Sequence, residues 1–508
     1  MNLIDNVTLG LQTALTLENL FYCLAGVTLG TFVGVIPGLG ALAAISLLLP
    51  VTFYIDSTAS LVMLAGVYYG TVYGGSTAAI LLNLPGVPSA AVACLDGYPL
   101  SMQGKGGLAL FITTIASFVG SMFGFVLLAS LAPTISQLGL MLGPADYVMM
   151  MALALTAAGT MSTGSRVKGI AMVVIGLLLG TIGTDVHTGV TRFAFGHAAL
   201  LDGISLVAIA MGLFGITEVI NASAGKGPER VLPKVTWRSM IPTRKEMRST
   251  AAPMLRGAGI GGFFGALPGV GGTIASFISY ALEKRISRHP EKFGHGALEG
   301  MSASESANNS AIQTAFIPTL TLGIPGDAVM ALMLGALIIH GIAPGPLLIE
   351  QQPGLFWGLV MSFVVGNIFL VILNIPLIGI WIKVLSIPRL YLFPAIMIFI
   401  AFGALSASMN PFDVYIVAAV GAFGWFLFKL GFQPAPLMLG FILGPMLEEN
   451  FRRALVLSRG NYEVFITRPV SLTLLIATVA LIVVPMAFML LQMAREKRQK
   501  QSVAQRDG

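Results

Sequence analysis

Charged residues are scarce in this chain of 508 residues: Asp, Glu, Lys and Arg make up only 10% of it, whereas 56% of the residues are hydrophobic. Soluble proteins carry about 25% charged residues, and soluble domains of this combined length would need a large polar surface. The composition therefore excludes cytosolic enzymes, nucleic-acid-binding proteins and disordered scaffolds. It indicates an all-α polytopic membrane protein, and the 60 glycines agree, because small residues let membrane helices pack closely.

Lysine and arginine are absent from the first 104 residues, and the first cation is Lys105. A signal peptide begins with cations, so we expect no cleavable one here. Because Lys and Arg are enriched in cytoplasmic loops, we expect the N-terminus on the outer side and the basic C-terminal tail in the cytoplasm. Cys23 and Cys94 belong to no CxxC or metal-ligand spacing, and we interpret them as small buried hydrophobes.

Sequence motifs of enzymes are also missing. The chain contains no HExxH, GxSxG or Walker A pattern, and its Pro-Gly-x-Gly segments lack the preceding strand and the acidic partner of a dinucleotide site. We therefore predict no enzymatic activity and no cofactor. An ATP-driven pump would need a nucleotide-binding domain that this sequence does not encode.

A basic segment divides the chain into halves. Eight cations fall within 31 residues there, namely Lys226, Arg230, Lys234, Arg238, Arg244, Lys245, Arg248 and Arg256. Such a run is typical of a solvated cytoplasmic loop, although it could also bind anionic lipid. We predict residues 1–222 as a first membrane repeat, 223–256 as a cytoplasmic linker, 257–450 as a second, inverted repeat, and 451–508 as a surface segment, a last transmembrane helix and a basic tail.

Two motifs occur once in each half and in the same order. Residues 34–40 read Gly-Val-Ile-Pro-Gly-Leu-Gly, and residues 265–271 read Gly-Ala-Leu-Pro-Gly-Val-Gly, 231 positions later. Asn-Leu-Pro-Gly at 83–86 and Gly-Ile-Pro-Gly at 323–326 follow them, 240 positions apart. Ordered motifs with nearly equal offsets indicate an internal repeat.

The first motif of each half interrupts an apolar stretch, because Pro and Gly break helices. Residues 257–282 could span a membrane, but cations stand directly on both sides of them. Both ends should then face the cytoplasm, so we expect a re-entrant hairpin that turns at Pro268 and Gly269. The hairpin that turns at Pro37 and Gly38 has acidic flanks and should enter from outside.

With these hairpins, the hydrophobic segments predict about 11 transmembrane helices plus two re-entrant hairpins in two inverted repeats. In this topology four arginines would lie on the outer side of the membrane, although Lys and Arg are normally enriched on the cytoplasmic side: Arg452, Arg453, Arg459 and Arg468. We interpret their segment as an amphipathic surface element.

Inverted repeats with broken helices are typical of secondary transporters, which bind substrate at the ends of half-helices and hold cations with unwound carbonyls. We predict that substrate is bound by Gly74, Gly75, Ser76, Thr77, Asn83, Pro85, Gly86, Asn308, Asn309, Ser310, Pro325 and Gly326. Backbone carbonyls near Gly74, Gly86 and Gly326 could hold Na⁺. Three nearby tyrosines are interpreted as packing residues or interface anchors: Tyr68, Tyr69 and Tyr73.

Two carboxylates, Glu305 and Asp327, lie within or beside the second broken segment. Each could carry a proton or bind a cation, or could instead lie at the water boundary. No Lys or Arg occurs in 57–94 or 308–346, so a bound anion there would need a cation in addition to polar donors. We expect cation coupling, with Na⁺ favoured over H⁺. Otherwise a basic loop residue, first of all Arg192, would have to reach the anion.

Several motifs carry a resemblance to a known family. They are the segments 34–40, Tyr73-Gly-Gly-Ser-Thr-Ala-Ala-Ile-Leu-Leu-Asn-Leu-Pro-Gly86, Leu95-Asp-Gly-Tyr-Pro99, 183–196, 267–272, Ala307-Asn-Asn-Ser310 and Leu320-Thr-Leu-Gly-Ile-Pro-Gly326. From about residue 20 to 450 the chain resembles the large permease subunit of tripartite tricarboxylate transporters, the TctA type. The resemblance implies a multi-pass protein of the bacterial inner membrane, a small TctB-like membrane subunit and a periplasmic TctC-like solute-binding protein.

Together these features predict ion-coupled uptake of a di- or tricarboxylate, such as a citrate-like acid. We also expect contact with membrane lipid and no binding of nucleic acid. A channel or a non-transporting membrane scaffold is the alternative. Paired, inverted helix breaks favour alternating access over a continuous pore, which would need rings of charges or carbonyls.

Overall fold

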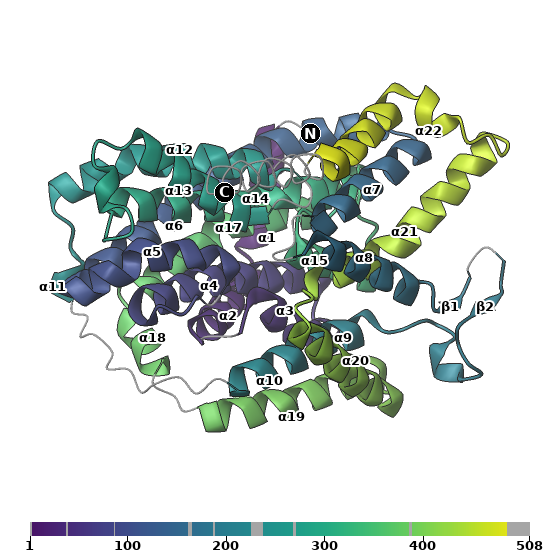
Figure 1. The fold of residues 1–508 in the computed structure, drawn as a ribbon, viewed down its shortest axis with the longest axis horizontal. Coiled ribbons are helices and arrows are strands. Elements are labelled where there is room, and N and C mark those ends of the chain that lie inside the picture. Colours follow the sequence, from purple (N-terminus) through teal and green to yellow (C-terminus); the bar gives the residue numbers. More distant parts are fainter. Residues whose placement is uncertain are drawn as a thin grey trace, which may run out of the picture.

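Helices make up nearly all of the computed structural model, which describes residues 3–36, 39–85, 87–160, 165–185, 188–224, 237–267, 271–385 and 389–484 (Figure 1). In these ranges, only β1 (Gly183–Thr184) and β2 (Thr191–Arg192) are strands, and they form a short antiparallel pair. The prediction of an all-α membrane protein is confirmed in this respect. Both predicted hairpin turns, Pro37-Gly38 and Pro268-Gly269, lie outside the described residues, as does Gly86.

The first half contains the helices α1 (Leu3–Ala14), α2 (Leu17–Val35), α3 (Ala41–Thr52), α4 (Ser57–Leu82), η1 (Pro88–Ala90), α5 (Ala91–Leu100), η2 (Ser101–Lys105), α6 (Gly106–Leu140), α7 (Pro144–Thr160), α8 (Arg166–Gly180), η3 (Ala198–Leu200), α9 (Leu206–Ala210), η4 (Met211–Ile216) and α10 (Thr217–Ala224). The second half contains α11 (Trp237–Met240), α12 (Arg244–Gly265), α13 (Gly271–Ile286), η5 (Pro290–Lys292), α14 (Leu298–Leu322), α15 (Ala328–Ile339), α16 (Leu348–Gln351), α17 (Pro353–Asn374), α18 (Ile378–Val384), α19 (Arg389–Ser408), α20 (Pro411–Lys429), α21 (Ala435–Leu457) and α22 (Val464–Thr467). A last apolar helix covers Pro469–Val484.

Five helices in the described part of the chain are long and apolar enough to cross a membrane: Leu17–Val35, Pro88–Leu140, Leu206–Ser223, Pro353–Asn374 and Pro411–Lys429. Four shorter apolar helices accompany them: Ala41–Thr52, Ala328–Ile339, Leu392–Ala407 and Pro469–Val484. A multi-pass membrane protein is therefore established. The count of about 11 spans stays a prediction, because several helices are shorter, or more polar, than an ordinary span.

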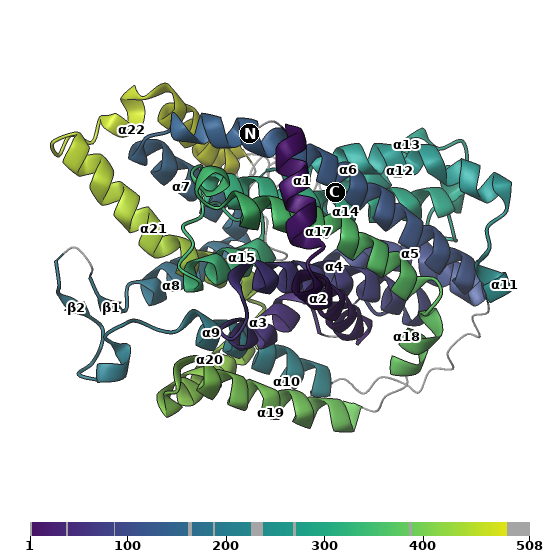
Figure 2. The same ribbon diagram turned by 180° about the vertical axis from the view of Figure 1, so that it is seen from behind.

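Two long helices, α4 and α14, run through the middle of the molecule and pack against α2 and α12 (Figures 1 and 2). Glycines make these contacts close. A Cβ atom on Gly30 of α2 would lie 2.3 Å from the carbonyl oxygen of Val67 in α4, and one on Gly261 of α12 would lie 2.0 Å from that of Ala307 in α14. Gly30 and Gly261 are 231 positions apart, and Val67 and Ala307 are 240 apart.

The neighbouring turns repeat this geometry. In the first half, Gly26 and Gly34 abut the carbonyl oxygens of Met63 and Thr71; in the second, Gly257 and Gly265 abut those of Ala303 and Ala311. All three glycine pairs have an offset of 231, and all three contacted pairs have an offset of 240. These are the offsets that separate the sequence motifs, so the two motifs of each half mark two helices that pack in the same register.

Both central helices end in the same way. The first residue after α4, Asn83, has φ 56°, and the first residue after α14, Gly323, has φ 69°. This left-handed conformation is common just beyond a helix, and a proline two residues later, Pro85 or Pro325, prevents the helix from continuing. Each central helix is thus broken at the Pro-Gly motif.

The helix α12 starts inside the segment that composition predicts as a linker. Its first turn is closed by a capping box: the Thr243 side chain accepts from the Glu246 N–H, while the Glu246 carboxylate accepts from the Thr243 N–H at 2.7 Å. Basic residues therefore belong partly to a helix rather than to a loop. The apolar stretch 257–282 therefore begins in the middle of α12 and continues into α13.

An ion pair joins the two arms around the second Pro-Gly turn. Arg256 in α12 donates from Nη2 to Oε1 of Glu283 in α13 at 2.6 Å, and from Nε to Oε2 at 3.0 Å. The two residues lie at similar distances in sequence from the turn. Lys284 follows Glu283 directly, so the ends of the two arms lie at the same level of the molecule.

Asp96, from the Leu-Asp-Gly-Tyr-Pro motif, ties the halves together. Its fully buried carboxylate accepts hydrogen bonds from the backbone N–H groups of Gly294, Gly296 and Ala297, at 2.8 to 2.9 Å. It also accepts from the Tyr280 hydroxyl at 2.9 Å. One first-half side chain thus caps the approach to α14 and holds α13 beside it.

Candidate substrate and ion site

Polar side chains line α14 where it passes α4 and α6. Glu305, Asn308, Asn309 and Gln313 recur every three to four residues, which places them along one side of the helix. Each is at most 2% exposed. Burying this many polar groups in a membrane protein is costly, so such a stripe indicates function.

Glu305 is the ionisable member of the stripe, and its partners are neutral. Ser76 of α4 donates to its carboxylate at 2.9 and 3.0 Å, and Ser117 of α6 donates at 3.4 Å. Asn309 completes the cluster by donating to the Ser117 hydroxyl at 2.8 Å and to the Glu305 carbonyl at 3.0 Å. No described Lys, Arg or His forms an ion pair with Glu305.

Asp327 stands at the break between α14 and α15. Its Oδ1 caps α15 by accepting from the Met330 N–H at 2.8 Å, and its Oδ2 accepts from the Tyr68 hydroxyl at 2.8 Å. Tyr68 belongs to α4, so this bond joins the two halves. The next residue of α4, Tyr69, donates to Oε1 of Gln313 at 3.3 Å. These tyrosines bond polar residues of the opposite half, which the interpretation as packing residues or anchors did not anticipate.

The structure separates the remaining predicted site residues into two groups. Ser76 and Asn309 meet at Glu305, and Asn308 lies beside the start of α13. Other polar groups serve the fold: Thr77 donates to the Tyr73 carbonyl of its own helix, and Ser310 donates to the Ala258 carbonyl of α12 at 2.8 Å. Asn83 and Pro85 are exposed, whereas Pro325 and Gly326 are buried.

The glycines of α4 have a packing role. Gly74 lies inside the continuous helix, and a Cβ there would be 2.4 Å from the Thr31 carbonyl oxygen of α2. Within an α-helix each carbonyl accepts a hydrogen bond from the residue four positions on. The carbonyls of Gly74 and Gly75 are therefore committed to the helix, and the unwound carbonyls are those beside the two Pro-Gly breaks.

Asn308 of α14 lies beside the start of α13, with its side-chain oxygen towards Gly272. The side-chain oxygen of Asn308 would be 2.4 Å from a Cβ on Gly272, while its nitrogen Nδ2 is buried without an acceptor. Gly271 has φ 65°, and a Cβ there would lie 3.9 Å from Oδ2 of Asp327. The first turn of α13, Asn308 and Asp327 therefore share one small region between the halves.

Glu218 has a half-buried side chain, and the sequence analysis did not single it out. It lies in the first turn of α10, and its Oε2 accepts from the backbone N–H of Gly40 at 2.9 Å. Gly40 is the N-cap of α3. The signal was present, because Glu218 is the one acidic residue in the apolar segment 204–221.

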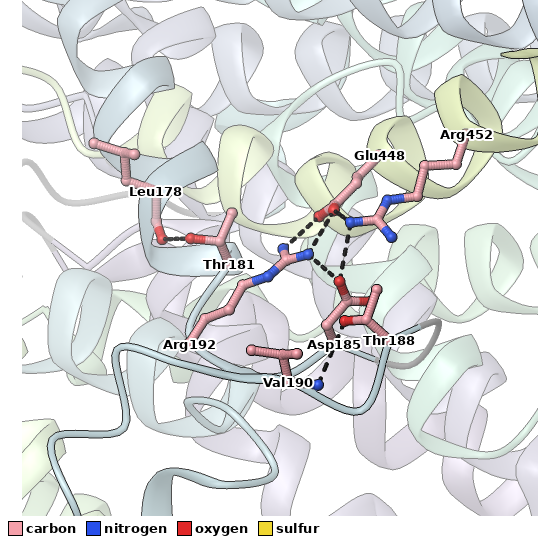
Figure 3. Close-up of polar contacts among 8 residues, drawn as sticks. All are labelled: Leu178, Thr181, Asp185, Thr188, Val190, Arg192, Glu448 and Arg452. Atoms are coloured by element: carbon pink, nitrogen blue, oxygen red, sulfur yellow. Dashed lines mark hydrogen bonds and ion pairs between the residues drawn. The ribbon is translucent and has the colours of Figure 1, made fainter. Parts of the chain in front are cut away.

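Arg192 is engaged far from this site (Figure 3). Its guanidinium donates to both oxygens of Glu448 at 3.0 Å and pairs with Asp185, while Arg452 bridges the same two carboxylates at 2.9 and 2.6 Å. The hydrogen bond to Glu448 raises the pKa of Arg192 above its usual value. The first basic candidate for an anion ligand is thus held at the base of the β1–β2 hairpin.

Three of the four arginines that the sequence places outside against the charge rule form ion pairs with carboxylates. Arg452 bonds Asp185 and Glu448, Arg453 bonds Glu449 at 2.5 Å, and Arg468 bonds Asp146 at 2.6 Å.

The architecture and the site define a class: a polytopic α-helical membrane protein in which a buried carboxylate, whose described partners are all neutral, lies where two similar halves meet. The comparisons make this class specific. The model of the tripartite tricarboxylate transporter TctA family matches residues 20–439, and the chain belongs to that family. It is therefore a component of a tricarboxylate transporter system, and the resemblance noted from the motifs is confirmed.

Two proteins of Agrobacterium vitis are similar to the chain. One, the "Uncharacterized 52.8 kDa protein in TAR-I ttuC' 3'region", is 47% identical over 500 residues, which cover 98% of this chain and 99% of that protein. The other, the "Uncharacterized protein in TAR-II ttuC' 3'region", is 55% identical over 215 residues, covering 42% of this chain and 89% of that protein. No solved structure matches the chain.

Proposed function

We propose that this chain is the translocating subunit of an ion-coupled secondary transporter that takes up di- or tricarboxylates. Family membership supports the class of substrate, and the buried Glu305 supports the coupling. A carboxylate in a low-dielectric interior needs a neutralising partner. Because the described partners of its carboxylate are the hydroxyls of Ser76 and Ser117, Glu305 can bind a proton or a cation and release it during each cycle.

The chemistry of the site favours a cation whose ligands are oxygens. Glu305 supplies two carboxylate oxygens, and Ser76 and Ser117 supply hydroxyl oxygens that can turn from donors to ligands. Na⁺ is therefore the first choice and H⁺ the second. We therefore propose the Glu305 carboxylate, rather than the Gly74 carbonyl, as a ligand of the ion.

The repeated glycine contacts support two structural repeats, and we infer that they are inverted in the membrane. The arms α12 and α13 form a re-entrant hairpin, as the Arg256–Glu283 pair and the flanking cations suggest. The protein then works in the bacterial inner membrane with its N-terminus periplasmic. A TctB-like membrane subunit and a TctC-like binding protein that delivers the carboxylate complete the system.

The hairpin predicts a labelling pattern. Single cysteines placed at Arg256 and Lys284 in a chain whose own cysteines are replaced should both react with an impermeant maleimide from the cytoplasmic side, because both ends of the hairpin return there. Inside-out and right-side-out vesicles provide the two directions. A cysteine at exposed Phe195 is the control and should react from the other side. Reaction of 256 and 284 from opposite sides would make this segment an ordinary span.

Uptake by the complete system tests the function. Proteoliposomes that contain this chain with its small subunit and binding protein should accumulate radiolabelled citrate or succinate, with saturation, when an inward Na⁺ gradient is imposed. A pH gradient applied alone separates H⁺ from Na⁺ coupling. Accumulation that neither gradient affects would contradict coupling, and non-saturating flux down the carboxylate gradient would favour a channel.

A further inference from the structure

The β1–β2 hairpin projects from one end of the molecule. Both views place it at the opposite end from α11, beyond the end of α8 (Figures 1 and 2). The helix α11 belongs to the cation-rich segment that the proposed orientation puts in the cytoplasm. The hairpin therefore extends from the outer end of the protein, away from the lipid that surrounds the sides of the helices.

Interactions on two sides hold the base of the hairpin. Arg192 pairs with Asp185 of the hairpin and with Glu448 of α21, which fastens the base to that helix (Figure 3). On the other side, the ring of His197 stacks on Phe412 of α20, with 5.9 Å between the ring centroids. The hairpin is thus fixed in place, and its tip is presented outward.

The tip of the hairpin exposes large apolar side chains. Val190, Phe193 and Phe195 are 60%, 59% and 78% exposed. Phe193 and Phe195 have φ angles of 51° and 50°, a left-handed conformation that is rare for bulky residues and clusters at functional sites. The two rings line a surface cavity of about 490 Å³ together with Leu201. Apolar groups gathered on a fixed, projecting element are typical of a protein-binding surface.

A protein partner fits this tip better than lipid does. Lipid contacts residues beside the membrane-spanning helices, whereas the tip lies beyond the end of α8 (Figure 1). No Lys or Arg is among the described residues that line the cavity, so an anionic headgroup would find no cation there. Asp202, which follows Leu201, is exposed and pairs with no cation in the part of the chain that the structure describes. A complementary partner surface is apolar, with a basic side chain at its edge.

We propose that residues 188–197, with Leu201 and Asp202, form the docking surface for the soluble solute-binding protein on the outer side of the membrane. This inference rests on the proposed function, in which such a protein delivers the carboxylate. Phe193 and Phe195 enter an apolar patch of the partner, and Asp202 meets a cation beside that patch. Arg192 then serves transport by positioning the docking surface rather than by touching the substrate.

Uptake at increasing concentrations of the binding protein tests this surface. Proteoliposomes hold this chain with its small subunit, and the purified, citrate-loaded binding protein is added outside. Replacing both Phe193 and Phe195 by Ser should raise the half-saturating concentration of the binding protein about tenfold or more, because buried aromatic residues dominate such interfaces. The rate at saturating binding protein should stay near that of wild type, because the surroundings of Glu305 are unchanged.

Two variants serve as controls for the loss of aromatic rings. Tyr462 is 66% exposed and lies next to α22, at the same end of the molecule but away from the hairpin (Figure 1). Tyr462→Ser should leave the half-saturating concentration unchanged. Replacing Phe193 and Phe195 by Leu, which stays apolar, should keep most of the affinity. Higher ionic strength should weaken binding to wild type more than binding to Asp202→Asn, because that variant lacks the charge that salt screens.

Direct binding of the citrate-loaded binding protein to the complex in lipid nanodiscs, with empty nanodiscs as the blank, provides the second readout. An unchanged half-saturating concentration in the Ser variant would overturn the docking surface. Loss of the small subunit from that purified variant would overturn it too, by assigning the tip to that subunit, as would a fall in the maximal rate alone. Absence of uptake by the wild-type complex at every concentration of the binding protein would instead count against the proposed function.

Discussion

Replacement of Glu305 by Gln should reduce gradient-driven carboxylate uptake about a hundredfold. The amide keeps the size of the side chain and can still bond Ser76 and Ser117, so the helices should stay packed. It cannot bind a proton or neutralise a cation. Interactions with a charged group are worth about 3 kcal/mol at most per bond, and each 1.4 kcal/mol is a factor of ten.

Three measurements identify the defect. Initial rates of citrate uptake are compared with and without the Na⁺ gradient, exchange of labelled for unlabelled citrate is followed at equal Na⁺, and the unfolding temperature is recorded. Glu350→Gln is the control, because Glu350 is exposed at the end of α16 and should transport normally. A folded Glu305→Gln variant that still responds fully to the gradient would place the coupling ion elsewhere, with Asp327 as the next candidate.

Sequence patterns predicted the parts of the fold that depend on local chemistry. The Pro-Gly motifs mark helix ends because proline and glycine act on their own backbone. The stripe of Glu305, Asn308 and Asn309 stands out because polar residues are expensive in an apolar segment. The start of α12 was equally available, since Thr243 and Glu246 have the spacing of a capping box. The start of this helix was not predicted, because the basic composition of the segment indicated a loop.

Contacts between segments that are distant in the chain could not be predicted from the sequence. Glu218 reaches Gly40 only because α10 folds back on α3, and Asp96 caps the approach to α14 from about 200 residues away. Arg192 was a plausible anion ligand until its two carboxylate partners were seen to hold it. In each case the partner decides the role, and no periodicity or spacing identifies the partner.

Substitution of Gly261 by Ala should destabilise the protein strongly. The new methyl group would lie 2.0 Å from the Ala307 carbonyl oxygen, a backbone atom that cannot rotate away. Relief requires α12 and α14 to separate, and overpacking of this kind costs about 1–3 kcal/mol or more. Separation also shifts Asn308 and Asn309, so transport should fall with stability.

The same helix provides the control, and the other half provides the test of the repeat. A methyl group on Gly259 meets no atom within 4 Å, so Gly259→Ala should leave the unfolding temperature unchanged or raise it slightly, since Ala favours the helix by up to about 1 kcal/mol. Gly30→Ala should reproduce the loss seen with Gly261→Ala, because Gly30 meets the Val67 carbonyl oxygen at 2.3 Å. The readout is detergent unfolding followed by size-exclusion fluorescence. Gly261→Ala and Gly259→Ala with equal unfolding temperatures would show that α12 and α14 are not in this close register, and would remove the structural basis for pairing the two halves.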